Sequence, residues 1–231
     1  MLGTEDLNTL RSLFGIDGNI IPEVIQKAME GMTPYLGHGY PKQVAGYVFW
    51  GELVKGIAEA ITHVRASGWM RKDVQNKPYL INDILNKVIF FARGNDDTGT
   101  TDDPKLKRIG TVTKQMIAVN QNNFQKSLFP DLQFQETQTL TDKWKRNGTE
   151  IWALLYYLDK DAKTVQCEIS KPVACDTPKD CLWEVRHTLP IYEFAEPVIL
   201  TDASDNAEVS TGTITSSTSE LDVPNVVVSR K

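Results

Sequence analysis

The chain has 231 residues, which is enough for one large domain or for one domain with an appendage. Its apolar content of 41% and charged content of 24% are ordinary for a globular protein, and its formal net charge of −5 argues against a surface that binds nucleic acid throughout. The first residues show no signal peptide, and the longest apolar run, residues 151–158, is far shorter than the ~20 residues of a membrane helix. We therefore expect a cytoplasmic protein with reduced thiols and no membrane partner.

Apolar residues at three- and four-residue steps predict helices through the N-terminal half. The predicted helical segments are 4–31 (one or two helices), 42–66, 80–92 and 111–128. The segment 42–66 carries Gly46, Gly51 and Gly56, each of which costs roughly 1 kcal/mol relative to alanine in an exposed helix. Such a cost suggests that another element approaches this helix closely.

Residues 33–42 form a predicted loop with two prolines and two glycines. Its candidate ligand contacts are Tyr35, His38 and Tyr40. The glycine spacing of a phosphate-binding loop is missing, and so is its terminal Lys-Ser/Thr pair. A plain connector is the alternative interpretation of this loop.

Residues 94–110 form the most unusual predicted loop, with four aspartates in its first half and three basic residues in its second. The candidate ligand-binding residues here are Arg93, Asn95, Asp96, Asp97, Lys105, Lys107 and Arg108. The aspartates could hold a hard cation such as Mg²⁺ or Ca²⁺, although the spacing is not that of an EF-hand. The bases could meet a phosphate or an acidic partner near the start of the following helix. The alternative is a solvated loop whose opposite charges neutralise one another.

Residues 150–189 predict an antiparallel meander of three strands, joined by a polar turn at 159–163 and a loop at 175–181. Further strands are predicted at 132–139 and 191–200. The expected fold is therefore α+β, a single domain 1–200 in which helical residues 1–130 pack on an antiparallel sheet formed by residues 131–200. The Ser/Thr-rich residues 201–231 predict a flexible tail.

The turns set the expected pairing, with Leu155 opposite Cys167, Tyr157 opposite Val165, Cys175 opposite Cys181 and Ile169 opposite His187. Alternation then gives one core face and one wet face. The core face is expected to hold Val165, Cys167, Ile169, Val173, Trp183, Val185 and Leu189, and the wet face Gln166, Glu168, Ser170, Glu184, Arg186 and Thr188. Glu168 and Arg186 would then form a surface ion pair worth roughly 0–1 kcal/mol.

The strand 151–158 is apolar on both faces. Its second face therefore needs a cover, which we expect to be the helix 42–66 or a partner protein.

Cys167, Cys175, Cys181 and His187 place four potential zinc ligands within 21 residues. Cys167 and Cys175 lie on one predicted strand, however, about 26 Å apart at ~3.3 Å per residue. We therefore predict no metal site there. Cys175 and Cys181 would face each other either as a disulfide or as two thiols.

No catalytic residue or cofactor can be assigned, because no Gly-x-Ser-x-Gly elbow is present and Glu168 with Lys171 departs from the Glu-x-Lys spacing of nuclease cores. We expect a non-enzymatic protein-interaction or accessory protein. The alternative is a metal-assisted enzyme acting on nucleic acid or phosphoester substrates, with Asp96, Asp97 and the bases at 105–108 near its site. A 94–110 loop lying against Glu168, or a 33–42 loop in a concave pocket, would favour the enzyme. Scattered loops and an exposed apolar patch would favour the interaction protein.

Overall fold

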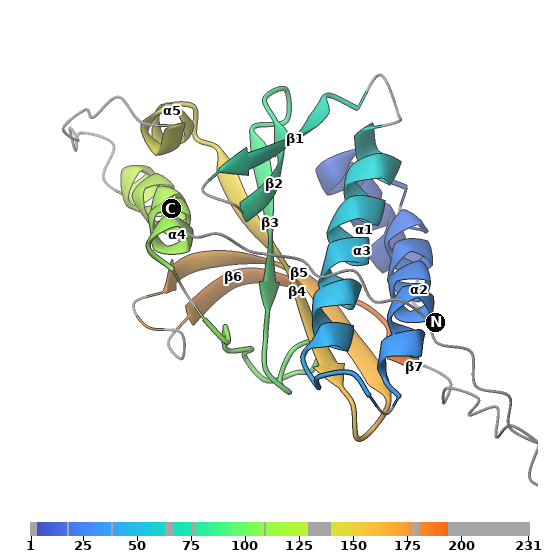
Figure 1. The fold of residues 1–231 in the computed structure, drawn as a ribbon. Coiled ribbons are helices and arrows are strands. Elements are labelled where there is room, and N and C mark those ends of the chain that lie inside the picture. The colour runs from blue at the N-terminus through green and yellow to red at the C-terminus, as the bar shows by residue number, and fades with distance from the viewer. Residues whose placement is uncertain are drawn as a thin grey trace, which may run out of the picture. The chain divides into compact units, whose positions relative to one another are not determined.

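A computed structural model describes residues 4–17, 19–37, 39–62, 67–74, 77–108, 110–128, 140–175, 177 and 181–193. Within these residues a mixed sheet separates two layers. The N-terminal helices cover one of its faces, and α4 with α5 lies on the other side (Figure 1). The predicted strand 132–139, the predicted tail 201–231 and most of the predicted strand 191–200 lie outside the described residues.

The helices are α1 (Thr4–Phe14), α2 (Ile20–Met32), α3 (Val44–Thr62), α4 (Thr111–Leu128) and α5 (Leu140–Arg146), with a 3-10 turn η1 (Thr33–Tyr35) after α2. The strands are β1 (Trp69–Val74), β2 (Lys77–Asn82), β3 (Lys87–Arg93), β4 (Glu150–Asp159), β5 (Thr164–Cys175), β6 (Cys181–Thr188) and β7 (Tyr192–Glu193). The predicted helices at 4–31, 42–66 and 111–128 are confirmed within the described residues. None of the described helices is long and apolar enough to cross a membrane.

The prediction of a purely antiparallel C-terminal sheet is wrong. The seven strands form one sheet in the order β1-β2-β3-β4-β5-β6, with β7 also pairing with β5, and the β3–β4 pair is parallel. Three of the strands come from the half of the chain that we predicted to be helical. The chain between β3 and β4 includes α4 and α5, since two parallel neighbours need a crossover connection.

Residues 80–92 form the hairpin β2–β3 and not the predicted helix. The Asn82 side-chain oxygen accepts from the N–H groups of Ile84 and Leu85 at 3.0 and 2.9 Å, and Asn86 takes a positive φ of 51°. Both features favour a tight turn over a helix. Ile84, one of the apolar residues whose spacing predicted this helix, is 77% exposed at the tip of the hairpin.

The predicted register of the β4–β5 hairpin is wrong by one residue. Tyr156, not Leu155, lies opposite Cys167. The physical reason is that Lys163 adopts a positive φ of 55° and belongs to the turn, so that pairing begins at Thr164. A shift of one residue moves every side chain of a strand to the other face relative to its neighbour.

With this register, both faces of β4 and β5 are covered. Trp152, Leu154, Tyr156 and Leu158 share a face with Val165, Cys167 and Ile169, in a cluster that we call the helix-side core. As expected, α3 covers the Trp152 face of β4: the ring of Phe49 lies 5.4 Å from that of Tyr156. The opposite face holds Ile151, Ala153 and Leu155 in a second cluster, the α4-side core.

The pairing of β5 with β6 is confirmed at both tested positions, Ile169 with His187 and Cys175 with Cys181. Between them, however, the register shifts on both sides of Pro172. Such irregularities rotate the strand, and the predicted faces fail here. Trp183 therefore packs against the α4-side core, whereas Val185 packs against the helix-side core.

Candidate functional site

The 94–110 loop leaves the end of β3 and is fixed to the sheet where it starts and where it returns. The Gly94 N–H donates to the Tyr156 carbonyl at 3.0 Å, and the Lys107 N–H donates to the Arg93 carbonyl at 2.9 Å. The loop is therefore part of the fold, in contrast to a solvated connector.

Asn95 organises the interior of this loop. Its side-chain oxygen accepts from the Lys105 N–H at 2.7 Å, and its side-chain nitrogen donates to the Asp97 carboxylate at 2.6 Å. Its own carbonyl accepts from the Thr98 N–H at 3.0 Å. Asn95 thus joins the acidic half to the basic half of the loop and engages Asp97, while Asp96 is exposed.

Glu168, on β5 beneath the loop, is a buried carboxylate with four hydrogen-bond donors. One oxygen accepts from the Ser170 hydroxyl at 2.6 Å and from Arg186 Nε at 3.2 Å. The other accepts from the Gly99 N–H at 2.8 Å and from Arg186 Nη2 at 2.7 Å. The predicted Glu168–Arg186 pair is therefore present but buried, and not at the surface. The predicted wet face is wrong at Glu168 and Ser170, which are 0% exposed, whereas Glu184 and Thr188 are exposed as predicted. The loop covers this face and supplies the Gly99 N–H in place of water.

Arg186 extends the same contact across the loop. Its Nη2 also donates to the Thr100 carbonyl at 3.1 Å, and its Nη1 pairs with Asp103 at 3.5 Å. Desolvation lowers the pKa of Arg186, but the hydrogen bonds and charge of Glu168 and the charge of Asp103 raise it overall. Arg186 is therefore held as a cation between strand and loop, and we call the Glu168–Arg186 pair the loop clamp.

Two of the four carboxylates of the loop have separate partners. Asp97 bonds to Asn95, and Asp103 faces Arg186. In the part of the chain that the structure describes, no group of three or more histidine, cysteine, aspartate and glutamate residues could hold a metal ion. The expected cation site at these aspartates thus gains no geometric support.

Three cations from separate segments converge at the end of the parallel pair β3–β4. Arg93 ends β3 beside Tyr156, and its Nε is buried without a hydrogen-bond partner. Lys160, in the β4–β5 turn, donates to the carbonyl of Lys42, which precedes α3. Desolvation and the charges of Arg93 and Lys42 lower the pKa of Lys160. We call Lys42, Arg93 and Lys160 the cation cluster.

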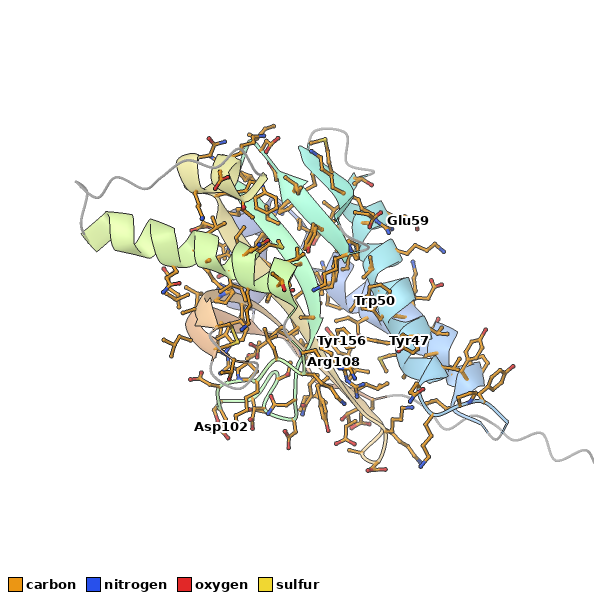
Figure 2. All side chains as sticks on the ribbon, turned by 60° about the vertical axis from the view of Figure 1, so that its left-hand side comes forward. Tyr47, Trp50, Glu59, Asp102, Arg108 and Tyr156 are labelled. Atoms are coloured by element: carbon orange, nitrogen blue, oxygen red, sulfur yellow. A yellow bond between two sulfur atoms is a disulfide. The ribbon has the colours of Figure 1, made fainter. Side chains whose placement is uncertain are left out.

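Sequence reasoning named Arg93 as a candidate and did not name Lys42 or Lys160. The other predicted bases, Lys105, Lys107 and Arg108, are exposed and follow the returning arm of the loop. Figure 2 shows Arg108 at the end of the sheet where Tyr156 lies. No signal in the sequence links Lys42 or Lys160 to Arg93, because only the tertiary fold brings the three segments together.

Acidic residues flank the cation cluster at Tyr157. Burial and the charges of Asp159, Asp96 and Asp161 raise the pKa of Tyr157, while Arg93 opposes them. The neighbouring Tyr156 points into the helix-side core and is 7% exposed. Burial raises the pKa of Tyr156 to about 12, although the charge of Arg93 lowers it.

The 33–42 loop leads into an exposed aromatic surface at the start of α3. Tyr35 and Tyr40 meet edge to face, with ring centroids 5.0 Å apart, and Tyr40 is 53% exposed. Tyr47 is 71% exposed, and Trp50 is half-buried against the helix-side core. Figure 2 shows Tyr47 and Trp50 on the N-terminal half of α3. The predicted contact His38 lies outside the described residues.

The loop does not line the cavity of about 400 Å³ on α2 and α3, whose walls come from those two helices. We expected that a 33–42 loop in a concave pocket would favour an enzyme. Residues 33–42 do not line this cavity, so the cavity does not support that expectation.

A second charged network, which the sequence did not suggest, lies at the start of β4. Glu150 pairs with Lys87 and with Lys171 at 3.0 Å, and Lys171 also pairs with Glu184 at 3.1 Å. Desolvation opposes ionisation of Glu150, yet the hydrogen bonds from the two lysines lower its pKa to about 2. Lys87 also lies 5.6 Å from the ring centroid of Trp152. These charges satisfy one another, which is typical of a structural network.

Cys175 and Cys181 form a disulfide with an S–S distance of 1.96 Å at the end of the β5–β6 hairpin. Their predicted opposition is confirmed, whereas the expectation of reduced thiols is wrong for these two. Cys167 is a free thiol in the helix-side core, and burial raises its pKa. His187 stacks on Trp152 with ring centroids 6.0 Å apart. The four residues of the zinc pattern therefore do not meet at one site: two form the disulfide, Cys167 lies in the helix-side core and His187 stacks on Trp152.

The chain was compared with protein-family models, with curated proteins and with solved structures, and none of them matches it.

Proposed function

We propose that the protein is a non-enzymatic interaction protein that binds a protein partner through an aromatic surface made of Tyr35, Tyr40, Tyr47 and Trp50. The observation that carries this proposal is the exposure of the two central rings, 71% for Tyr47 and 53% for Tyr40. Tyrosine and tryptophan are enriched at protein interfaces and dominate their hot spots.

The shape of α3 at this surface suits a partner. Tyr47 and Trp50 are three residues apart and therefore neighbours on the helix. A Cβ atom added at Gly46 or Gly51 would meet nothing within 4 Å, so the helix surface beside Tyr47 is open. A partner side chain can approach the backbone there and pack against the rings.

The enzyme alternative gains one observation, because the 94–110 loop does lie against Glu168. That contact would favour metal-assisted chemistry if it brought Glu168 to a ligand. Instead, Glu168 is 0% exposed and its oxygens accept from Ser170, Gly99 and Arg186. The contact is better explained as the loop clamp, and we therefore place the interaction function first.

A site-specific crosslinker tests the proposal. p-Benzoylphenylalanine at Tyr47 should crosslink a protein in extracts of the native host, whereas the same group at Lys72, an exposed position on β1, should not. The captured protein is then purified. Its affinity for a Tyr40→Ser/Tyr47→Ser variant should fall by about 10-fold or more, as for two hot-spot residues. A purified partner that binds this variant as tightly as the parent would refute the proposal.

A cytoplasmic location stays a prediction. The Cys175–Cys181 disulfide argues against it, because disulfides are rare in reducing compartments. Thiol labelling of the protein in intact host cells would decide whether the bond is present there.

A further inference from the structure

The cation cluster, in which Arg93 is half-buried and Lys42 and Lys160 are exposed, differs from the half-buried cations elsewhere in the fold. Lys87, Lys171 and Arg186 each pair with a carboxylate. Among the described residues, no carboxylate forms an ion pair with Lys42, Arg93 or Lys160. Instead the ammonium group of Lys160 donates to a backbone carbonyl, that of Lys42.

This arrangement brings together three positive charges, none of which is in an ion pair with a described carboxylate, although Asp96, Asp159 and Asp161 lie at its edge beside Tyr157. Arg93 is half-buried, and its Nε has no hydrogen-bond partner. Arg93 and Lys42 both act on the charge of Lys160. An anion that approaches the three side chains would gain a favourable charge interaction with each of them.

The cation cluster adjoins the aromatic surface. Lys42 lies two residues after Tyr40 and two residues before the start of α3 at Val44. The ring contact of Phe49 with Tyr156 places the first half of α3 over the end of β4, where Arg93 pairs with Tyr156. One partner can therefore reach both features at once.

The flanking charges limit the length of the anion. Asp96, Asp159 and Asp161 surround Tyr157, close enough to raise its pKa, and Arg93 acts on the same group. A nucleic-acid strand carries a phosphate at every nucleotide and would soon meet these carboxylates. The net charge of −5 opposes an extended polyanion as well. A segment with a few negative charges avoids both penalties.

We infer that the partner of the aromatic surface is a protein with a short acidic segment, whose carboxylates bind Lys42, Arg93 and Lys160. This inference rests on the proposed function and adds the chemistry of the partner.

The test is a titration of the full chain with an acetylated hexaglutamate peptide at low salt. Binding is monitored by the NMR chemical shifts of the backbone amides. We expect shifts confined to residues 40–47, 93–94 and 156–161. We expect the affinity to fall about 10-fold or more in Lys42→Glu/Lys160→Glu, a change of exposed residues that should leave the melting temperature unaltered. The control Lys27→Glu/Lys72→Glu makes the same change in net charge on α2 and β1 and should bind as the parent does.

Three results would overturn the inference: no peptide shifts, shifts spread over other basic residues, or tighter binding of hexathymidylate than of the peptide at the same residues. The last result would assign the cluster to nucleic acid. Failure of this test is distinct from failure of the proposed function. A partner captured at Tyr47 whose binding is unchanged in Lys42→Glu/Lys160→Glu keeps the interaction function and removes the acidic segment.

Discussion

The side chain of Asn120 hydrogen-bonds to both backbone groups of Ile151. Its oxygen accepts from the Ile151 N–H at 2.8 Å, and its nitrogen donates to the carbonyls of Ile151 and Pro172 at 2.7 and 2.6 Å. Asn120 is 3% exposed on α4. It hydrogen-bonds to β4 near the start of that strand and to β5 where the register shifts at Pro172. Asn120 therefore joins α4 to β4 and to β5, the strand that carries Glu168 of the loop clamp.

Asn120→Leu should therefore destabilise the fold strongly. The substitution keeps the side-chain volume but leaves one buried N–H and two buried carbonyls without their partner. Each of these groups that water does not reach destabilises the fold by about 1–3 kcal/mol. We expect a loss of about 2–4 kcal/mol in the free energy of unfolding, measured by urea denaturation. Gln121→Leu, at the exposed neighbouring position, is the control and should change stability by no more than about 0.5 kcal/mol. Equal stabilities of the two variants would show that water replaces the Asn120 amide.

The loop clamp supports a second prediction. Glu168→Gln preserves shape but removes the charge that faces Arg186, and a buried ion pair broken on one side costs about 3–5 kcal/mol. We expect the amide of Gly99, which donates to Glu168, to lose its protection in hydrogen exchange. The matched control is Asp83→Asn, which breaks the Lys143–Asp83 pair at the surface, where both side chains are nearly half exposed. That change should cost less than about 1 kcal/mol. Retained protection of Gly99 in Glu168→Gln would show that the loop holds its place without the clamp.

The helices could be predicted from apolar spacing only where capping and turn residues agreed with it. Thr111–Leu128 is bounded by Gly110 and Pro130, and its predicted limits are those observed. Residues 80–92 have the same spacing, but Asn82 and Asn86 provide the turn chemistry of a hairpin. Periodicity alone does not separate a helix from two short strands joined by a turn.

The candidate site was predictable only in part. The sequence shows which charged residues a segment contains, but only the tertiary structure shows which of these charges form ion pairs. Arg93 was a candidate because it immediately precedes the charged loop 94–110, but the sequence does not show that the aspartates of this loop form no ion pair with it. The cover over Glu168 depends on a register that changes with the conformation of a single residue, Lys163. Lys42 and Lys160 became relevant only when the fold placed them beside Arg93.

The disulfide supports a third prediction. Cys175 and Cys181 are six residues apart, and closing so short a loop should stabilise the fold by about 2 kcal/mol in the chain-entropy model. We expect Cys175→Ser/Cys181→Ser to lower the free energy of unfolding by about this amount, measured by urea denaturation without reductant. Dithiothreitol should lower the stability of the parent to the same level and leave the variant unchanged. If dithiothreitol leaves the stability of the parent unchanged, the Cys175–Cys181 bond does not stabilise the fold.

Glu150 makes the stability of the fold dependent on pH. Its pKa falls from 4.5 to about 2 on folding, so its contribution to stability is fully present above pH 4.5 and is lost as the pH falls toward 2. A shift of this size corresponds to about 3 kcal/mol, which we reduce to about 1–2 kcal/mol because the Glu150 side chain is 33% exposed to solvent screening. The variant Glu150→Gln should be less stable than the parent at pH 6 and should lose less stability between pH 5 and pH 2.5, as urea denaturation at each pH would measure. Glu23→Gln, an exposed substitution of the same kind on α2, is the control. If Glu150→Gln and the parent lose stability in parallel over this range, Lys87 and Lys171 do not hold Glu150 in its ionised form.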